Sequence, residues 1–82
     1  SSDEQNVADA VNQFFERLEL NIKQILAEDS DKLLAQPGIS AQFIVTSIEG
    51  TISRYIRAKF KEQPSSYSEN IWTLIALSTF KD

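Results

Sequence analysis

The final predicted helix of this 82-residue chain is apolar on every side. Successive side chains of a helix project at about 100° to one another, so its large residues point in all directions around the axis. These residues are Ile71, Trp72, Leu74, Ile75, Ala76, Leu77 and Phe80. A helix of this kind is buried in a large core or against another chain. Because a domain this small buries only about 60% of its unfolded surface, we expect a subunit interface here.

The composition favours a single ordered helical domain, or one piece of a larger one, and argues against an enzyme. Hydrophobic residues make up 41% of the chain, with two glycines and two prolines. There is no histidine, the commonest general base and metal ligand, and no cysteine. We therefore expect no catalysis, cofactor or metal. No apolar run approaches the roughly 20 residues that span a bilayer, so we expect no membrane contact.

Hydrophobic periodicity predicts three helices, at about residues 4–28, 38–62 and 67–80. Ser2 with Gln5, and Ser66 with Glu69, have the spacing of capping boxes at the first and third helix. Proline is tolerated in a first helical turn, so Pro37 is predicted to begin the second helix, and Ser40 is an alternative N-cap. Pro64 is predicted to end that helix. Leu33 and Leu34 are predicted to anchor the intervening segment 29–38.

Two of the helices carry apolar stripes with steps of three and four residues. In the first helix the predicted core stripe is Val7, Val11, Phe14, Phe15, Leu18, Ile22, Ile25 and Leu26. In the second it is Ala41, Ile44, Val45, Ile48, Ile52, Tyr55 and Ile56. We expect both stripes to face the core.

The far side of the second helix has a row of mostly small or charged residues around Gly50. A glycine inside a helix costs about 1 kcal/mol relative to alanine. One interpretation is that it permits close approach of a second helix. The other is that it is tolerated on an exposed surface and has no role.

Residues 54–61 contain four cations, Arg54, Arg57, Lys59 and Lys61, and no acid, whereas the whole chain carries a net charge of −4. Such a segment can contact phosphate. Cations are also favoured at the C-terminal end of a helix, where they meet its dipole. We prefer the second interpretation because the chain as a whole is acidic, and we expect no sequence-specific DNA binding by these residues.

Three blocks of residues together resemble a branch of a known family. The first block is NQFFERLE at residues 12–19, continuing to KQIL at residues 23–26. The second is Ala41-Gln42, Glu49-Gly50, Ser53-Arg54, Arg57, Phe60-Lys61 and Pro64, and the third is Trp72 with residues 74–76. In order and spacing, over about residues 10–78, they are similar to the C-terminal half of the SlmA-type nucleoid occlusion factors. These factors are a divergent branch of the TetR family of bacterial DNA-binding regulators.

The resemblance implies an all-α fold: a three-helix C-terminal segment of a TetR-type regulatory domain, dimerising through a four-helix bundle. DNA would be bound only by an N-terminal helix-turn-helix domain that is absent from residues 1–82. In nucleoid occlusion, the DNA-bound homodimer antagonises polymers of the tubulin-like division protein FtsZ, which implies a cytoplasmic, nucleoid-associated protein. We expect the dimer interface to contain Phe43, Ser47, Gly50, Arg54, Ile71, Trp72, Ile75 and Phe80.

Two other functions remain open. The segment 29–38 is shorter than in the nucleoid occlusion factors, which is compatible with an ordinary TetR-type repressor that binds a small effector. A large apolar cavity lined by Phe14, Phe15, Leu18, Ile48 and Tyr55 would favour that repressor. A self-standing helical adaptor that binds partner helices is the third possibility.

Overall fold

The computed structural model describes residues 2–59, 61 and 64–82, and these form an all-α structure. The elements are α1 (Ser2–Ala27), the short 3₁₀ helix η1 (Ser30–Lys32), α2 (Pro37–Arg57) and α3 (Pro64–Thr79). The predicted fold class is therefore confirmed. The described part of the chain contains no strand beyond one isolated antiparallel bridge between Leu33 and Phe80.

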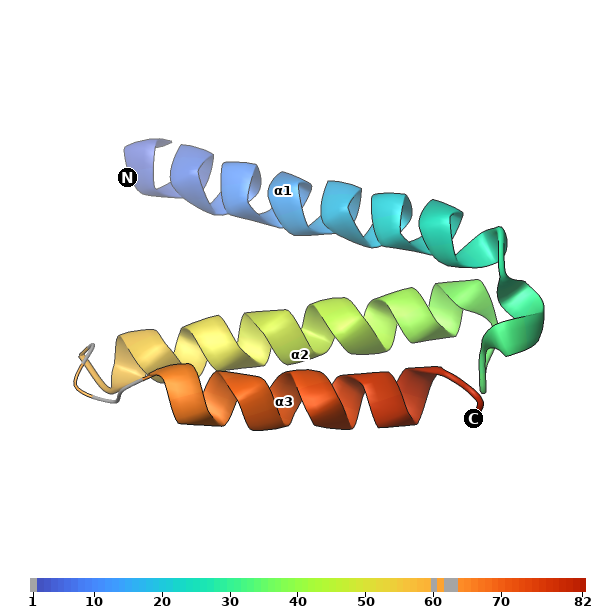
Figure 1. Ribbon diagram of the computed structural model, residues 1–82. Helices are drawn as coiled ribbons and strands as arrows, with labels where there is room; N and C mark the ends of the chain where they lie inside the picture. The colour runs from blue at the N-terminus through green and yellow to red at the C-terminus, as the bar shows by residue number, and fades with distance from the viewer. Residues whose placement is uncertain (1, 60, 62–63) are drawn as a thin grey trace.

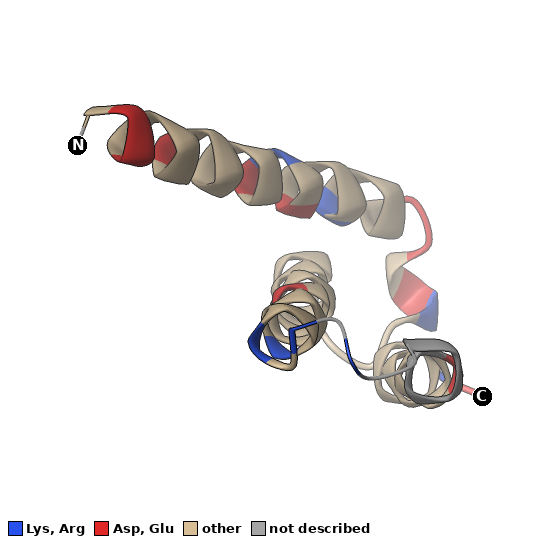
Figure 2. Cartoon of the chain, turned by 90° about the vertical axis from the view of Figure 1, so that its left-hand side faces the viewer, with Lys and Arg blue, Asp and Glu red and all other residues tan. Residues whose placement is uncertain are grey.

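The three helices form an open arrangement in which α1 stands apart from the other two. The helices α2 and α3 lie side by side, and α1 packs on α2 near the chain reversal but diverges from it toward the N-terminus (Figure 1). Seen along α2 and α3, α1 runs obliquely above α2, from the side away from α3 at its N-terminus toward α3 at its C-terminus (Figure 2). The radius of gyration is 14.8 Å, whereas a compact domain of this length has about 12 Å. The three helices are therefore less compactly arranged than in a closed domain of this length.

The start of α2 follows the predicted proline signal. Gln36 is the N-cap with extended backbone angles, and Pro37 occupies the first helical turn, where its missing N–H has no partner to lose. The backbone N–H of Ser40 donates to the carbonyl of Gln36 over 2.9 Å. Ser40 is therefore inside the helix and is not its cap, and its hydroxyl donates to the carbonyl of Ala35 at 3.3 Å.

The end of α2 comes five residues earlier than the predicted position 62. Lys59 has a φ of 55°, and a left-handed residue cannot continue a right-handed helix. The N–H of Ala58 donates to the carbonyl of Arg54 at 3.0 Å, and that of Lys59 donates to Ile56 at 2.9 Å, which closes the last turn. Phe60, Glu62 and Gln63, which the prediction placed at or just beyond this end, lie outside the described residues.

The two helix starts also differ from the predicted capping boxes. The helix α1 already includes Ser2, and the side-chain amide of Gln5 donates to Asp9 one turn ahead over 2.9 Å. The helix α3 already begins at Pro64, so Ser66 lies within its first turn. Proline with its fixed φ fits the first position of a helix, and it begins α3 where we had expected it only to stop α2.

The core of the chain is small and excludes most of the predicted stripe of α1. The buried apolar residues are Leu33, Ala41, Val45 and Ile75. No residue of α1 is buried. Its half-buried residues include Phe15, Leu18, Ile22 and Leu26, whereas Val7, Val11, Phe14 and Ile25 are exposed. The prediction that the whole α1 stripe faces the core is wrong for this chain, because α2 covers only one edge of it.

One end of the structure is closed by backbone pairing, which we call the clasp. The N–H of Leu34 donates to the carbonyl of Thr79 at 2.9 Å, and the N–H of Lys81 donates to Lys32 at 2.8 Å. Between these bonds, Leu33 is only 3% exposed, whereas Leu34 is 58% exposed. The predicted anchoring role is thus confirmed for the side chain of Leu33, whereas Leu34 anchors the segment only through its backbone N–H, because adjacent residues of an extended segment point to opposite sides.

The clasp leads to a stability prediction with a matched control. Leu33→Ala should lower the free energy of unfolding by about 2–5 kcal/mol, the usual cost of emptying a buried leucine site. Leu34→Ala should change it by less than about 0.5 kcal/mol, as at most exposed positions. Urea denaturation followed by circular dichroism, at one fixed protein concentration, measures both. Equal effects at the two leucines would contradict this account of the clasp.

Candidate dimer interface

The α2–α3 pair presents an exposed apolar surface, which we call the outer face. Ile39 and Phe43 of α2 line a shallow depression with Ser78 of α3, which places them on one side of the pair. Leu74 lies one turn before Ser78 on that side of α3, and Leu77 lies next to it. Ile39, Phe43, Leu74 and Leu77 are all exposed. This surface is the strongest candidate for contact with a second copy.

Four of the predicted interface residues lie along one row of α2 on the outer face. Phe43 and Gly50 are exposed, and Arg54 lies in the last turn of the helix. Ser47 is half-buried, and its hydroxyl donates to the carbonyl of Phe43 at 2.8 Å. The steps of four, three and four residues keep the row on one side of the helix, and its middle contains only small side chains.

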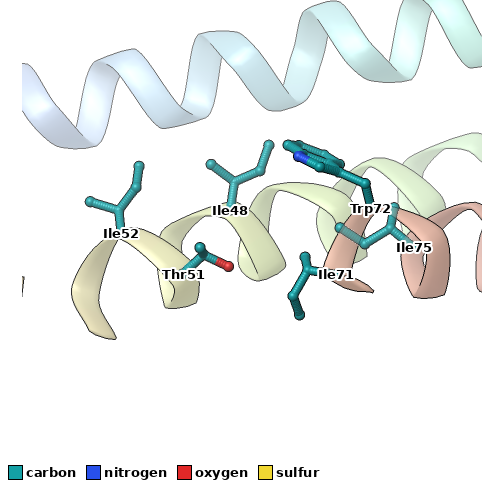
Figure 3. Close-up of a pocket in the computed structure, with 6 residues that line it drawn as sticks. All are labelled: Ile48, Thr51, Ile52, Ile71, Trp72 and Ile75. Atoms are coloured by element: carbon teal, nitrogen blue, oxygen red, sulfur yellow. The ribbon is translucent and has the colours of Figure 1, made fainter. Parts of the chain in front are cut away.

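Three other predicted residues lie elsewhere, in what we call the inner groove. This groove separates α2 and α3 on the side that faces α1, and its cavity of about 150 Å³ is lined by Ile48, Thr51, Ile52, Ile71, Trp72 and Ile75. Figure 3 shows Trp72 pointing from α3 toward α1, with Ile48 and Ile52 pointing the same way from α2. Ile75 is only 7% exposed, so it belongs to the core of the single chain and is not available to a partner.

Phe80, the last predicted interface residue, belongs to the clasp. It forms the antiparallel bridge with Leu33 and remains partly exposed. The structure therefore does not bring the eight predicted residues together on one surface. It divides them among the outer face, the inner groove and the clasp.

Sequence reasoning missed three exposed residues of the outer face: Ile39, Leu74 and Leu77. The signal for them was present, because Ile39 precedes Phe43 by one turn and Leu74 precedes Ser78 by one turn. The sequence did not show which side of α3 packs against α2. A helix that is apolar all round does not indicate by its sequence which side faces its own chain.

The predicted effector cavity is not formed by the described residues. The five residues proposed to line an effector cavity do not share one: Phe14 is 61% exposed, and of the five only Ile48 reaches the inner groove. The rings of Phe14 and Phe15 contact each other edge to face, with centroids 5.2 Å apart. The cavity of the inner groove, about 150 Å³, and the depression between α1 and α2 that Phe15 lines, about 280 Å³, are both smaller than the roughly 300–1,000 Å³ of small-molecule pockets.

Within the described residues there is also no cluster of three or more His, Cys, Asp or Glu side chains suited to a metal ion. Nor is any helix among them long and apolar enough to cross a membrane.

Comparison with known proteins identifies the family. The model of the SlmA-like family, described as the C-terminal domain of tetracyclin repressor-like proteins, matches residues 2–79. The chain belongs to this family. It is therefore a TetR-like C-terminal domain, and the resemblance found in the sequence is confirmed.

Several curated relatives are named nucleoid occlusion factor SlmA. The relative from Vibrio campbellii is 32% identical over 76 residues, which cover 88% of this chain and 39% of the relative. The relative from Aliivibrio fischeri is 36% identical over 70 residues, covering 80% of this chain and 36% of the relative. The chain thus spans about two fifths of the length of these proteins. No solved structure matches it.

Gly50 provides a test of the outer face. A Cβ added there meets no atom within 4 Å, so nothing inside the single chain requires a glycine. If a second copy packs closely against it, Gly50→Leu should weaken dimerisation by about 1–3 kcal/mol through overpacking, and sedimentation equilibrium over a concentration series measures this. Gln42→Leu, at another exposed position of α2, is the control and should leave dimerisation unchanged.

If Gly50 lies on an exposed surface instead, the Gly50→Leu substitution should have the opposite effect. On an exposed surface, replacing glycine by a better helix former should stabilise the fold by about 0.5–1 kcal/mol. A Gly50→Leu protein that melts at higher temperature and dimerises as tightly as the original would remove Gly50 from the interface.

Proposed function

We propose that this chain is the dimerisation and regulatory domain of a SlmA-like nucleoid occlusion factor. In this proposal the outer faces of two copies meet, so that α2 and α3 of each subunit form a four-helix bundle. The observation that supports it most directly is the exposure of Ile39, Phe43, Leu74 and Leu77 together on one side of the α2–α3 pair. Monomers rarely expose large contiguous apolar patches.

The shape of the outer face suits a two-fold interface. The helices α2 and α3 lie side by side (Figure 1) and present one continuous surface, and a two-fold axis places the same surface on both subunits. The small residues Ser47, Gly50 and Ser78 lie between the large apolar ones. Small residues let helix backbones approach closely, so the large side chains of each copy can fill the spaces left by the other.

The intact protein, in this proposal, acts at the nucleoid in the cytoplasm and has no enzymatic activity. The relatives that share this domain are named nucleoid occlusion factors, and the resemblance of the residues suggests antagonism of FtsZ polymers. DNA binding is assigned to the part of the polypeptide outside residues 1–82. Arg54 and Arg57 lie in the last turn of α2, where they complement the helix dipole and need no DNA to explain them.

A pair of exposed leucines tests the dimer. Leu77 on the outer face is 64% exposed, and Leu20 on the polar side of α1 is 52% exposed. Leu77→Asp should convert the intact protein from dimer to monomer at micromolar concentration, because it buries a charge in an apolar contact. Leu20→Asp should remain a dimer. Sedimentation equilibrium gives the mass of each, and a dimeric Leu77→Asp protein would rule out this interface.

The same two variants test whether dimerisation is required for nucleoid occlusion in cells. In a bacterial host that lacks its own nucleoid occlusion factor, the intact protein should restore the exclusion of division septa from the chromosome. Fluorescence microscopy of septa and DNA measures this directly. Leu77→Asp should fail to restore exclusion, whereas Leu20→Asp should succeed. If the unaltered protein has no effect on septum position, the nucleoid occlusion function is wrong even where the dimer is right.

A further inference from the structure

The row of α2 residues on the outer face has a spacing that is the same in both directions along the helix. The row consists of Phe43, Ser47, Gly50 and Arg54. Its steps of four, three and four residues keep all four on one side of the helix. An antiparallel second copy of α2, related by a two-fold axis at the middle of the row, therefore presents the same four residues at matching positions.

In this register each residue of the row faces a complementary residue of the second copy. The half-buried Ser47 faces the exposed Gly50, and both are small enough for the two helix axes to lie at the short end of the usual 8–10 Å. Phe43, which is 42% exposed, faces the exposed Arg54. A guanidinium over the face of an aromatic ring is attracted by the electrons of the ring.

The surroundings of Phe43 also favour a cation that carries hydrogen-bond donors. Phe43 lines a depression of about 250 Å³ together with Ser78 and Thr79, where α3 ends. The C-terminal end of a helix carries partial negative charge, and the last turn of α3 contains no basic residue. Thr79 is 2% exposed, and its hydroxyl has no hydrogen-bond partner among the described residues. A buried hydroxyl without a partner costs free energy, so a donor that enters this depression is stabilised there.

We propose that Arg54 of each subunit lies over Phe43 of the other, beside the end of α3, and that these two contacts set the register of the dimer. The proposal rests on the outer face being the dimer interface. It adds the position of the two-fold axis, which crosses α2 at a right angle between Ser47 and Gly50. An axis parallel to the helices would place α2 on α3 of the second copy and would form neither contact.

The positions of the cations select Arg54 of a second copy as the occupant. Arg57 lines the depression between α1 and α2, away from the outer face, and Lys59 follows the end of α2. Arg54 of the same chain lies about 16 Å from Phe43 along the helix, at 1.5 Å per residue. A single chain therefore does not make this contact by itself.

Opposite charges at position 43 of the intact protein test the contact. Phe43→Glu and Phe43→Lys both remove the ring, but only the carboxylate attracts Arg54 of the second copy. We expect Phe43→Glu to dimerise at least about tenfold more tightly than Phe43→Lys in 0.1 M salt, because an attractive pair replaces a repulsive one at two contacts. Screening acts over about 10 Å at this salt concentration, so Arg54 of the same chain contributes little. Sedimentation equilibrium measures both dissociation constants.

Two controls accompany this comparison. In the Arg54→Gln background the difference between Phe43→Glu and Phe43→Lys should disappear. Gln42 is exposed and lies outside the row, so Gln42→Glu and Gln42→Lys should dimerise equally.

Cross-linking locates the axis without depending on the strength of the contact. The chain contains no cysteine, so a single thiol can be placed at each position. A short bismaleimide should join the two copies of Ser47→Cys, which lie next to the axis. The two copies of Phe43→Cys lie about 16 Å apart along the helices and should remain unlinked. Mass spectrometry of the linked peptides identifies the joined positions, whatever cysteines the rest of the intact protein contains.

Equal dimerisation of Phe43→Glu and Phe43→Lys overturns the proposal, and so does a difference that persists with Arg54→Gln or equal cross-linking at positions 43 and 47. If both charged variants are monomeric, the cross-linking result decides. Where Leu77→Asp dissociates the dimer but any of these tests fails, the outer face is the interface and only the register is wrong. A Leu77→Asp protein that remains dimeric removes the interface, and the register with it.

Discussion

The clasp between the chain reversal and the end of α3 is the interaction on which the rest of the structure depends. Two backbone hydrogen bonds, from Leu34 to Thr79 and from Lys81 to Lys32, tie together segments almost fifty residues apart. Leu33 is buried between them. Because the chain reversal also connects α1 to α2, this one contact sets where α3 lies relative to both of the other helices.

From that arrangement follow two apolar surfaces. The α2–α3 pair is held together at the clasp and by a few buried side chains such as Ile75, and its outer face exposes Ile39, Phe43, Leu74 and Leu77. On the side that faces α1, the inner groove contains a cavity of about 150 Å³, and α1 diverges from α2 toward the N-terminus (Figure 1).

The core contains only four buried apolar residues among those described. Stability in folded proteins is a small difference between large opposing contributions, so uncovered apolar helices cannot be neutral additions. In the proposed dimer, a second copy buries the outer face. Loss of the dimer should therefore weaken the fold as well as the function.

The sequence by itself determined the number and type of the elements, and the family. Apolar steps of three and four residues specify helices, and Pro37 marks the start of α2. It failed at the end of α2, because a left-handed lysine at position 59 has no sequence signal of the kind that glycine provides. It failed at the capping boxes, because a serine three residues before an amide or acid side chain is common inside helices too.

Only the tertiary structure decided which apolar residues face which partner. The sequence showed that α3 must be covered on all sides, but Ile75 turns toward its own chain, Trp72 lines the inner groove, and Leu77 is exposed to solvent. The rotation of a helix about its axis depends on contacts with residues far away in the sequence, here those at the clasp. For an all-round apolar helix, no local pattern favours one rotation over another, so the packing alone could separate core from interface.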